Sequence, residues 1–187
     1  DPQVHAGLAR AYQYKKAFTL AEKHYLKALS FSDNDPKYQN NLAALYISME
    51  RWDQAIDYFQ KAAANLLFMR TELAIMGKGY AYYRKGDYPE ALQAYREAEA
   101  IAPRQASLHF HIGETYSALG RTDLAIESYE KALLHASEYS EARYQMAVLL
   151  LKSQQIEKAK KLLTVIVDQD PRSDWGMKAS DFLKALK

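Results

Sequence analysis

The histidines are the side chains of this sequence best suited to hold a metal ion or to move a proton. Two of them, His109 and His111, lie two residues apart. On a helix these imidazoles would point about 200° apart, so they could not chelate one ion. His109 also falls at a packing position of the repeat described below. We interpret all five histidines as structural or solvated.

Motifs of known catalytic sites are absent from the sequence. It contains no Gly-rich phosphate loop, no HExxH and no GxSxG arrangement. Carboxylates such as Glu127, Glu130 and Glu157 are expected on solvated helix faces. The chain has no cysteine, which excludes thiol nucleophiles, disulfides and zinc–thiolate sites. We therefore expect a protein that is not an enzyme and needs no cofactor and no metal.

The charge balance argues against nucleic acid as a partner. Twenty-five Lys and Arg residues face 23 Asp and Glu residues, and the basic residues form no stripe with aromatics. The longest purely apolar run, residues 146–151, is far shorter than the ~18 residues of a membrane span. We expect no direct membrane insertion within this chain. The sequence begins at Asp1 without methionine or an apolar leader, so we interpret it as a trimmed or processed form.

Small residues recur at a near-constant interval and define an internal repeat. Spacings of 34, 36, 34 and 34 residues separate Ala21, Ala55, Ala91, Ala125 and Ala159. Four residues after each alanine stands a large residue: Tyr25, Phe59, Tyr95, Tyr129 and Leu163. The preceding segment of each unit also pairs a small residue with a large one three positions later: Ala9 and Tyr12, Ala43 and Tyr46, Gly79 and Tyr82, Gly113 and Tyr116, Ala147 and Leu150. Two antiparallel helices approach to about 8 Å only at small side chains, so we interpret the alanines as packing residues.

The pattern predicts eleven helices, over residues 3–15, 18–31, 36–48, 52–66, 72–85, 88–101, 105–118, 122–135, 139–152, 156–168 and 174–186. The β-branched run at 162–167 is assigned to a helix because it keeps the repeat register. Asp35 before Pro36 predicts an N-cap, and Asp87 with Glu90 predicts a capping box. Gly86 and Gly120 suit tight turns inside a unit.

The 36-residue interval marks an irregular junction at residues 64–71. Two extra residues stand there, so either the preceding helix is longer or the connection bulges outward. The last predicted helix carries an apolar stripe formed by Trp175, Ala179, Phe182 and Leu186. We expect this helix to cover the end of the fifth unit.

The stretch from Gly79 to Pro103 resembles a tetratricopeptide repeat (TPR), whose small and aromatic residues follow a 34-residue pattern. The resemblance implies an all-α, right-handed superhelix (α-solenoid) and a function in protein binding. We predict a single domain over residues 1–187. Its five repeats cover about 2–35, 36–69, 72–104, 105–138 and 139–172, and a capping helix covers about 174–186.

The resemblance also implies that the first helix of each unit lines a concave groove for a partner protein or peptide. The candidate groove residues are Arg10, Tyr14, Asn40, Asn41, Met76, Tyr80, Tyr83, Arg84, Phe110, Glu114 and Tyr144. Among them, Tyr80, Tyr83, Phe110 and Tyr144 would form an aromatic track, and Tyr, Phe and Arg are typical interface anchors. The alternative is that these rings only pack between neighbouring first helices.

The carboxylate clamp, a TPR subtype that holds acidic chaperone tails, fits the groove poorly. Arg10 and Asn41 stand at plausible clamp positions. Ala6, Leu73 and Gly77 stand where further polar or cationic residues would be needed. We therefore do not expect a receptor for chaperone tails.

Residues 40–43, the long junction from Asn65 to Ala74, and residues 77–83 are similar to bacterial type IV pilus biogenesis TPR lipoproteins of the secretin pilotin type. That resemblance implies an assembly factor for a pilus or secretin. It would be periplasmic or held at the outer membrane through an N-terminus trimmed from this chain; a cytoplasmic location is the alternative. Two other functions stay open: a self-assembling structural adaptor, forming a homo-oligomer, and a regulatory domain of a larger protein.

Overall fold

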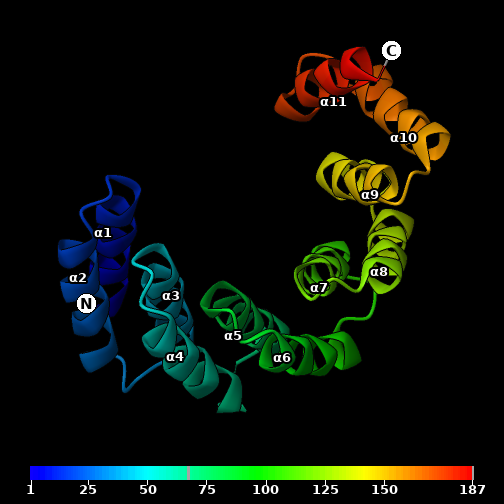
Figure 1. Ribbon diagram of the computed structural model, residues 1–187. Coiled ribbons are helices and arrows are strands. Elements are labelled where there is room, and N and C mark those ends of the chain that lie inside the picture. The colour runs from blue at the N-terminus through cyan, green and yellow to red at the C-terminus, as the bar shows by residue number, and fades with distance from the viewer. Residues whose placement is uncertain (67, 187) are drawn as a thin grey trace. The chain divides into compact units, whose positions relative to one another are not determined.

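The computed structural model describes residues 1–66 and 68–186 of the chain. Within these ranges it contains eleven α-helices and no strand, which confirms the predicted all-α class of helix-turn-helix repeats. Five helix pairs are followed by one final helix (Figure 1). The helices are α1 (Pro2–Tyr14), α2 (Phe18–Ser30), α3 (Pro36–Ser48), α4 (Trp52–Ala64), α5 (Thr71–Lys85), α6 (Tyr88–Ile101), α7 (Ala106–Ala118), α8 (Thr122–His135), α9 (Ser140–Lys152), α10 (Ile156–Gln169) and α11 (Asp174–Ala185).

Every predicted helix is present, and its ends lie within two residues of the predicted ones. The run at 162–167 lies inside α10, as the repeat register indicates. At the irregular junction, α4 ends at Ala64 because Asn65 turns to an extended backbone with ψ 116°. The extra length therefore lies after α4, in the connection and in α5, which has 15 residues where α3 has 13. Residue 67, which belongs to this junction, lies outside the described residues.

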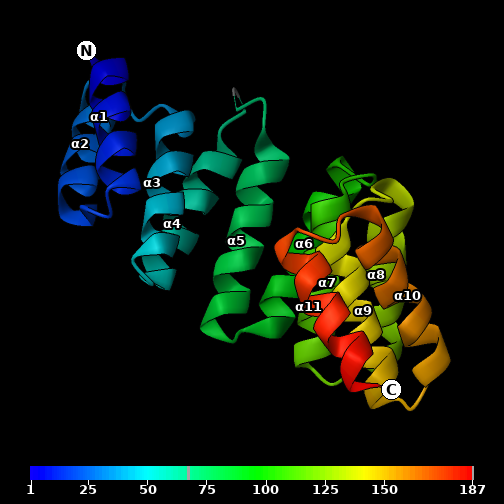
Figure 2. The same ribbon diagram turned by 90° about the horizontal axis from the view of Figure 1, so that it is seen from above.

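Residues 1–103 and 104–187 form two compact units. The first unit contains α1 to α6, and the second contains α7 to α11 (Figure 2). The boundary falls between the third and fourth repeats. That the chain forms one domain stays a prediction.

The core of each unit is a seam of small residues flanked by rings. The five repeat alanines are fully buried, and the large residues that follow them are at most 4% exposed. The two helices of a pair pack so closely at this seam that even one added methyl group would clash. A Cβ atom at Gly79 would stand 2.7 Å from Cε1 of Tyr95. At Gly113 it would stand 2.6 Å from Cε1 of Tyr129. The packing role of the small residues is confirmed.

The turn inside each helix pair has the same backbone in every repeat. Gly86 and Gly120 have φ of 94° and 70°, as their type predicts. The equivalent positions in the other repeats hold Lys16, Glu50 and Gln154, with φ of 58°, 57° and 59°. Since L-residues seldom adopt this left-handed conformation, the geometry of the repeat overrides residue preference at three turns.

Of the two predicted helix caps, one is confirmed and one is wrong. Asp35 accepts a hydrogen bond from the Lys37 amide at 2.8 Å, as expected. Asp87 is the N-cap residue of α6, but its side chain makes no capping hydrogen bond. Instead its carboxylate lies 3.1 Å from Nζ of Lys85, which also reaches Asp53 at 2.9 Å. The ion pair across the turn replaces the capping box.

The final helix packs on the second unit as predicted. Trp175, Phe182 and Leu186 pack against the core formed by α8, α9 and α10, and Ala179 is fully buried within it. Ser173 caps α11 by accepting a hydrogen bond from the Gly176 amide at 3.0 Å. The helix therefore shields apolar surface that the fifth repeat would otherwise expose.

Candidate functional site

An arginine and four aromatic rings gather around the C-terminal end of α5 in the first unit. The guanidinium of Arg84 lies 4.9 Å from the ring centroid of Trp52 and 5.8 Å from that of Tyr80. Its Nη1 also donates a hydrogen bond of 3.0 Å to the Tyr80 hydroxyl. Tyr83 lies 6.3 Å from Tyr80 and 5.8 Å from Tyr88, measured between ring centroids. We name these five residues the arginine–aromatic cluster.

The cluster holds its cation in a fixed place near the surface. Arg84 is exposed, whereas the four rings are partly buried. The hydrogen bond that Arg84 donates to Tyr80 raises the pKa of Arg84, so the guanidinium keeps its charge at all physiological pH values. An arginine that is already ordered against rings loses less side-chain entropy when a partner binds, and Tyr, Trp and Arg are the commonest binding hot spots.

Two members of the cluster were not among the candidate groove residues. Trp52 begins α4 and Tyr88 begins α6. Each follows a left-handed turn residue, Glu50 or Gly86, by two positions. These turns bring the start of each second helix beside the end of α5, where Arg84 lies. That register is the signal that could have identified them.

Two other candidates, Asn40 and Asn41, line a cavity of about 410 Å³ between the start of α3 and the connection before α5. Leu73 and Arg70 line it from the other side. The Oδ1 atom of Asn40 is inaccessible to solvent and has no hydrogen-bond partner among the described residues. Met69, also in the lining, is 95% exposed. The cavity thus combines amide groups, a cation and apolar surface.

The remaining candidates of the first unit are less organised. Arg10 is exposed on α1, and Tyr14 at its end is 90% exposed. Met76 is partly buried on α5. At the position of Gly77, a Cβ atom would stand 2.5 Å from the ring of Phe59, so no clamp-type cation could stand there. Ala6 is buried as well, which agrees with the poor fit to a carboxylate clamp.

In the second unit, Phe110 is a core residue, so its predicted place on the groove surface is wrong. Only 3% of the residue is exposed. Its ring lies 5.1 Å from Tyr139 and 5.7 Å from Tyr129, measured between centroids. Tyr139 comes from the turn before the next repeat and covers the face of α7 that was predicted to be open. Phe110 therefore packs between repeats, as the alternative interpretation has it.

Tyr144 also makes packing contacts. Its ring lies 5.2 Å from that of Trp175 and 6.2 Å from that of Phe182, both on α11. One edge still lines a cavity of about 350 Å³ beside Lys178 and Asp181. The capping helix thus covers much of the surface that Tyr144 was predicted to offer.

Glu114 belongs to a small acidic group on the second unit. Its Oε2 atom lies 2.9 Å from Nδ1 of His111. Burial raises the pKa of Glu141, and the nearby charge of Glu114 raises it further. Burial and the charges of Glu141 and Glu114 raise the pKa of Tyr139 to about 12. These carboxylates lie close enough to interact, and they would favour a basic partner residue.

Residues 1–66 and 68–186 contain no group of three or more His, Cys, Asp or Glu side chains that could hold a metal ion. His109 is buried and stacks on His135 with 5.4 Å between the ring centroids, in agreement with its packing role. None of the helices in this part of the chain is long and apolar enough to cross a membrane.

Comparison with known families finds tetratricopeptide repeats along most of the chain. Models described as TPR repeat or tetratricopeptide repeat match residues 40–67, 79–120 and 118–180. The Hsp70-Hsp90 organizing protein of Triticum aestivum is 33% identical over 95 residues, which cover 45% of this chain and 16% of that protein. The human cell division cycle protein 16 homolog is 24% identical over 139 residues, 71% of this chain and 22% of that protein. The chain thus spans about a fifth of the length of these relatives.

Two solved structures of pilus-related proteins share the fold. PilW, a widely conserved type IV pilus biogenesis factor, superposes with a TM-score of 0.81 at 19% identity, over 95% of this chain and 82% of PilW. PilF of Pseudomonas aeruginosa has a TM-score of 0.77 at 15% identity, over 97% of this chain and 82% of PilF. At these identities the likeness establishes the repeat fold alone.

Proposed function

The chain is a tetratricopeptide repeat protein, and we propose that it binds a segment of a partner protein at the arginine–aromatic cluster of α5. The observation that carries the proposal is the position of Arg84 over Trp52 and Tyr80. An ordered, exposed guanidinium framed by rings offers rigid contact area and a directed charge, as binding hot spots do. A partner segment with an acidic residue next to an apolar one would complement it.

The cavity at Asn40 and Asn41 extends the proposed contact surface within the first unit. Asn40 is partly buried, and its side chain lines the cavity, where its amide group would hydrogen-bond to the backbone of the partner segment. Asn41 and Arg70 line the same cavity and would contact the segment beside it.

We further propose that the partner belongs to the cell envelope and that the protein assists assembly of a pilus or secretin. The resemblance of the junction at residues 65–74 to pilus biogenesis lipoproteins supports this role, as does the fold shared with PilW and PilF. In this role the chain acts as a scaffold and performs no chemistry. A self-assembling adaptor is the competing function, and light scattering over a range of protein concentrations separates the two.

Affinity capture from native envelope extract tests the proposal. The bait is the wild-type chain, the Tyr80→Ala/Arg84→Ala variant, or an Arg96→Ala control that removes an exposed cation on α6. We expect wild type and control to retain a secretin or pilus component that the double variant loses. If all three capture the same proteins while their helicity is equal, the cluster is not the binding surface.

A further inference from the structure

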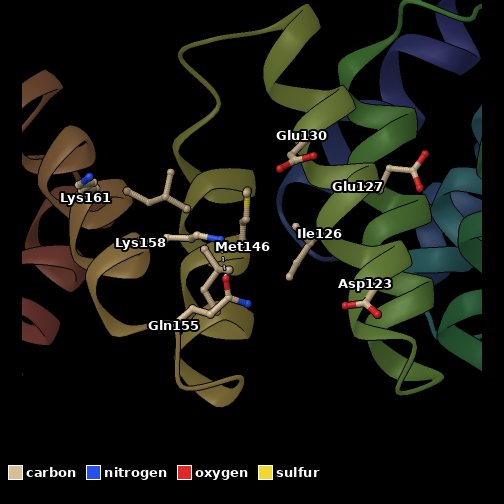
Figure 3. A pocket seen from close by; sticks show the side chains of 10 residues that line it. Asp123, Ile126, Glu127, Glu130, Met146, Gln155, Lys158 and Lys161 are labelled. Atoms are coloured by element: carbon tan, nitrogen blue, oxygen red, sulfur yellow. Dashed lines mark hydrogen bonds between the residues drawn. The ribbon is translucent and has the colours of Figure 1, made fainter.

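A cavity of about 480 Å³ opens between α8 and α10 in the second unit, and none of the candidate groove residues lines it. Figure 3 shows side chains of both helices around it. Four apolar residues contribute to its lining: Ile126, Met146, Leu150 and Leu162. Met146 and Leu150 come from α9.

The cavity exists because the fifth repeat has a leucine at a position where the other four repeats have a tyrosine. The large residue of the first helix is tyrosine in four repeats, at Tyr12, Tyr46, Tyr82 and Tyr116, and leucine at position 150. A leucine side chain lacks the ring and the hydroxyl group that reach outward between neighbouring second helices. Leu150 therefore leaves space where the repeat pattern places a ring.

The equivalent place in the first unit shows what fills that space. Tyr46 is buried and donates a hydrogen bond of 2.9 Å to Oε1 of Glu22. Nη1 of Arg51 lies 2.8 Å from both Glu22 oxygens, and the guanidinium lies 4.5 Å from the Tyr46 ring centroid. Tyr46, Glu22 and Arg51 thus form a plug that combines a ring, an anion and a cation.

All three plug residues are replaced in the second unit. By the repeat spacing, Leu150 stands for Tyr46, Ile126 for Glu22 and Gln155 for Arg51. The cavity consequently has an apolar floor and no internal ion pair. Its volume falls within the range of about 300 to 1,000 Å³ that is typical of ligand sites.

The two walls of the cavity carry opposite charges. Asp123, Glu127 and Glu130 line it from α8 with helical spacing, and Lys158 and Lys161 line it from α10 (Figure 3). Among the described residues, no ion pair joins the two walls. Glu127 pairs with Lys131 on its own helix, and Lys158 donates to Gln155 at 2.8 Å. Because neither row neutralises the other, both rows can still face the charges of a partner.

We propose that this cavity is a second protein-binding site that accepts an aromatic side chain from an amphipathic helix of a partner. The ring occupies the space over Leu150 that is equivalent to the one Tyr46 fills in the second repeat. Lys or Arg residues of the partner helix face the acidic row of α8, and its Asp or Glu residues face the basic row of α10. A helix presents such rows at i, i+4 and i+7, the spacing of Asp123, Glu127 and Glu130.

Two synthetic helical peptides test the proposal. The matched peptide carries a central tyrosine, a row of lysines on one edge and a row of glutamates on the other, so that with its tyrosine over Leu150 each row meets the opposite charge. The reversed peptide exchanges the two edges. Binding is followed in low salt by calorimetry and by the methyl NMR signal of Met146 on the cavity floor. We expect the matched peptide to shift this signal and to bind about tenfold more tightly than the reversed one.

Three variants of the protein make the result decisive. Leu150→Tyr restores the ring in cis and is expected to weaken binding of the matched peptide at least about tenfold. Leu134→Tyr places the same ring at an exposed site of α8 outside the cavity lining. This variant is expected to bind the matched peptide with unchanged affinity. Lys158→Glu/Lys161→Glu, on exposed positions, reduces the preference for the matched peptide and does not depend on repacking of the core.

Several outcomes would overturn the proposal. The first is that neither peptide binds, the second that both bind equally, and the third that Leu150→Tyr binds the matched peptide with unchanged affinity. The fourth is that Lys158→Glu/Lys161→Glu keeps the full preference for the matched over the reversed peptide. If neither peptide binds but the chain dimerises and Leu150→Tyr prevents this, a second copy of the chain is the occupant and the partner-helix proposal is wrong.

Discussion

The guanidinium of Arg84 lies 4.9 Å from the ring centroid of Trp52. This contact joins the end of α5 to the beginning of α4. The two residues are 32 positions apart in the sequence and meet because both flank turns of neighbouring repeats. The contact orders a cation at the surface of the first unit. Both the stability of this contact and its use in binding can be measured.

A double-mutant cycle on Trp52 and Arg84 should give a coupling free energy of about 0.5 to 1 kcal/mol, because cation–π pairs near the surface have this magnitude. The variants are Trp52→Leu, Arg84→Gln and their combination, and the measurement is urea unfolding followed by circular dichroism. Additive effects of the two substitutions would mean that the observed contact contributes nothing.

Ala91→Leu should destabilise the protein by about 1 to 3 kcal/mol, because the larger side chain overpacks a fully buried position of the helix seam. Ala44→Leu is the matched control, since Ala44 is an exposed alanine on α3. Thermal unfolding of both variants checks the prediction. A melting temperature of Ala91→Leu equal to that of the control would contradict the assigned packing role.

Gln154→Gly should stabilise the protein by about 0.5 to 1 kcal/mol. The backbone at Gln154 has φ of 59°, a conformation that costs an L-residue more than it costs glycine. The reverse change, Gly120→Gln at the equivalent turn, should destabilise by a similar amount. Chemical unfolding of the two variants decides the matter, and effects of the same sign in both would refute the argument.

The stability of the first helix pair should decrease as pH falls below about 6.5. Partial burial and the nearby charge of His24, whose Nδ1 lies 3.0 Å from that of His5, lower the pKa of His5, with smaller effects from Lys27 and the N-terminal amine. Between the folded-state pKa of His5 and 6.5, the unfolded chain binds more protons than the folded chain. The free energy of unfolding therefore decreases as the pH is lowered through this range. His5→Gln should show a shallower decrease between pH 7 and 5 by urea unfolding. An unchanged slope would show that His5 does not control it.

The repeat pattern predicted the helices and the core well because each alanine and each large residue recurs five times in register. Single residues that depart from the pattern were harder to interpret. The left-handed turns at Lys16, Glu50 and Gln154 follow from the geometry of the repeat, and residue propensity gives no sign of them. The predicted capping box at Asp87 is wrong because the Asp87 carboxylate forms an ion pair with Lys85 instead.

The candidate site was predicted only in part, since its residues depend on contacts between different repeats. Tyr80, Tyr83 and Arg84 were identified on α5, but Trp52 and Tyr88 join them from neighbouring helices. Phe110 was assigned to the surface because the repeat pattern places it with the groove residues. Its ring in fact contacts Tyr129 of α8 and Tyr139 of the next repeat, and the second contact could not be read from one repeat alone. Sequence periodicity gives the face of a helix, but the next repeat decides whether that face is open.

Site-specific photo-crosslinking in the native cell tests the central proposal most directly. A p-benzoyl-phenylalanine residue replaces Tyr83 beside Arg84, or Leu134 as a control on α8, and crosslinked products are identified by mass spectrometry. We predict that position 83 crosslinks to a pilus or secretin component and that Arg84→Ala in the same chain abolishes the product. If position 83 yields no crosslink to another protein while position 134 does, partner binding at the arginine–aromatic cluster is contradicted.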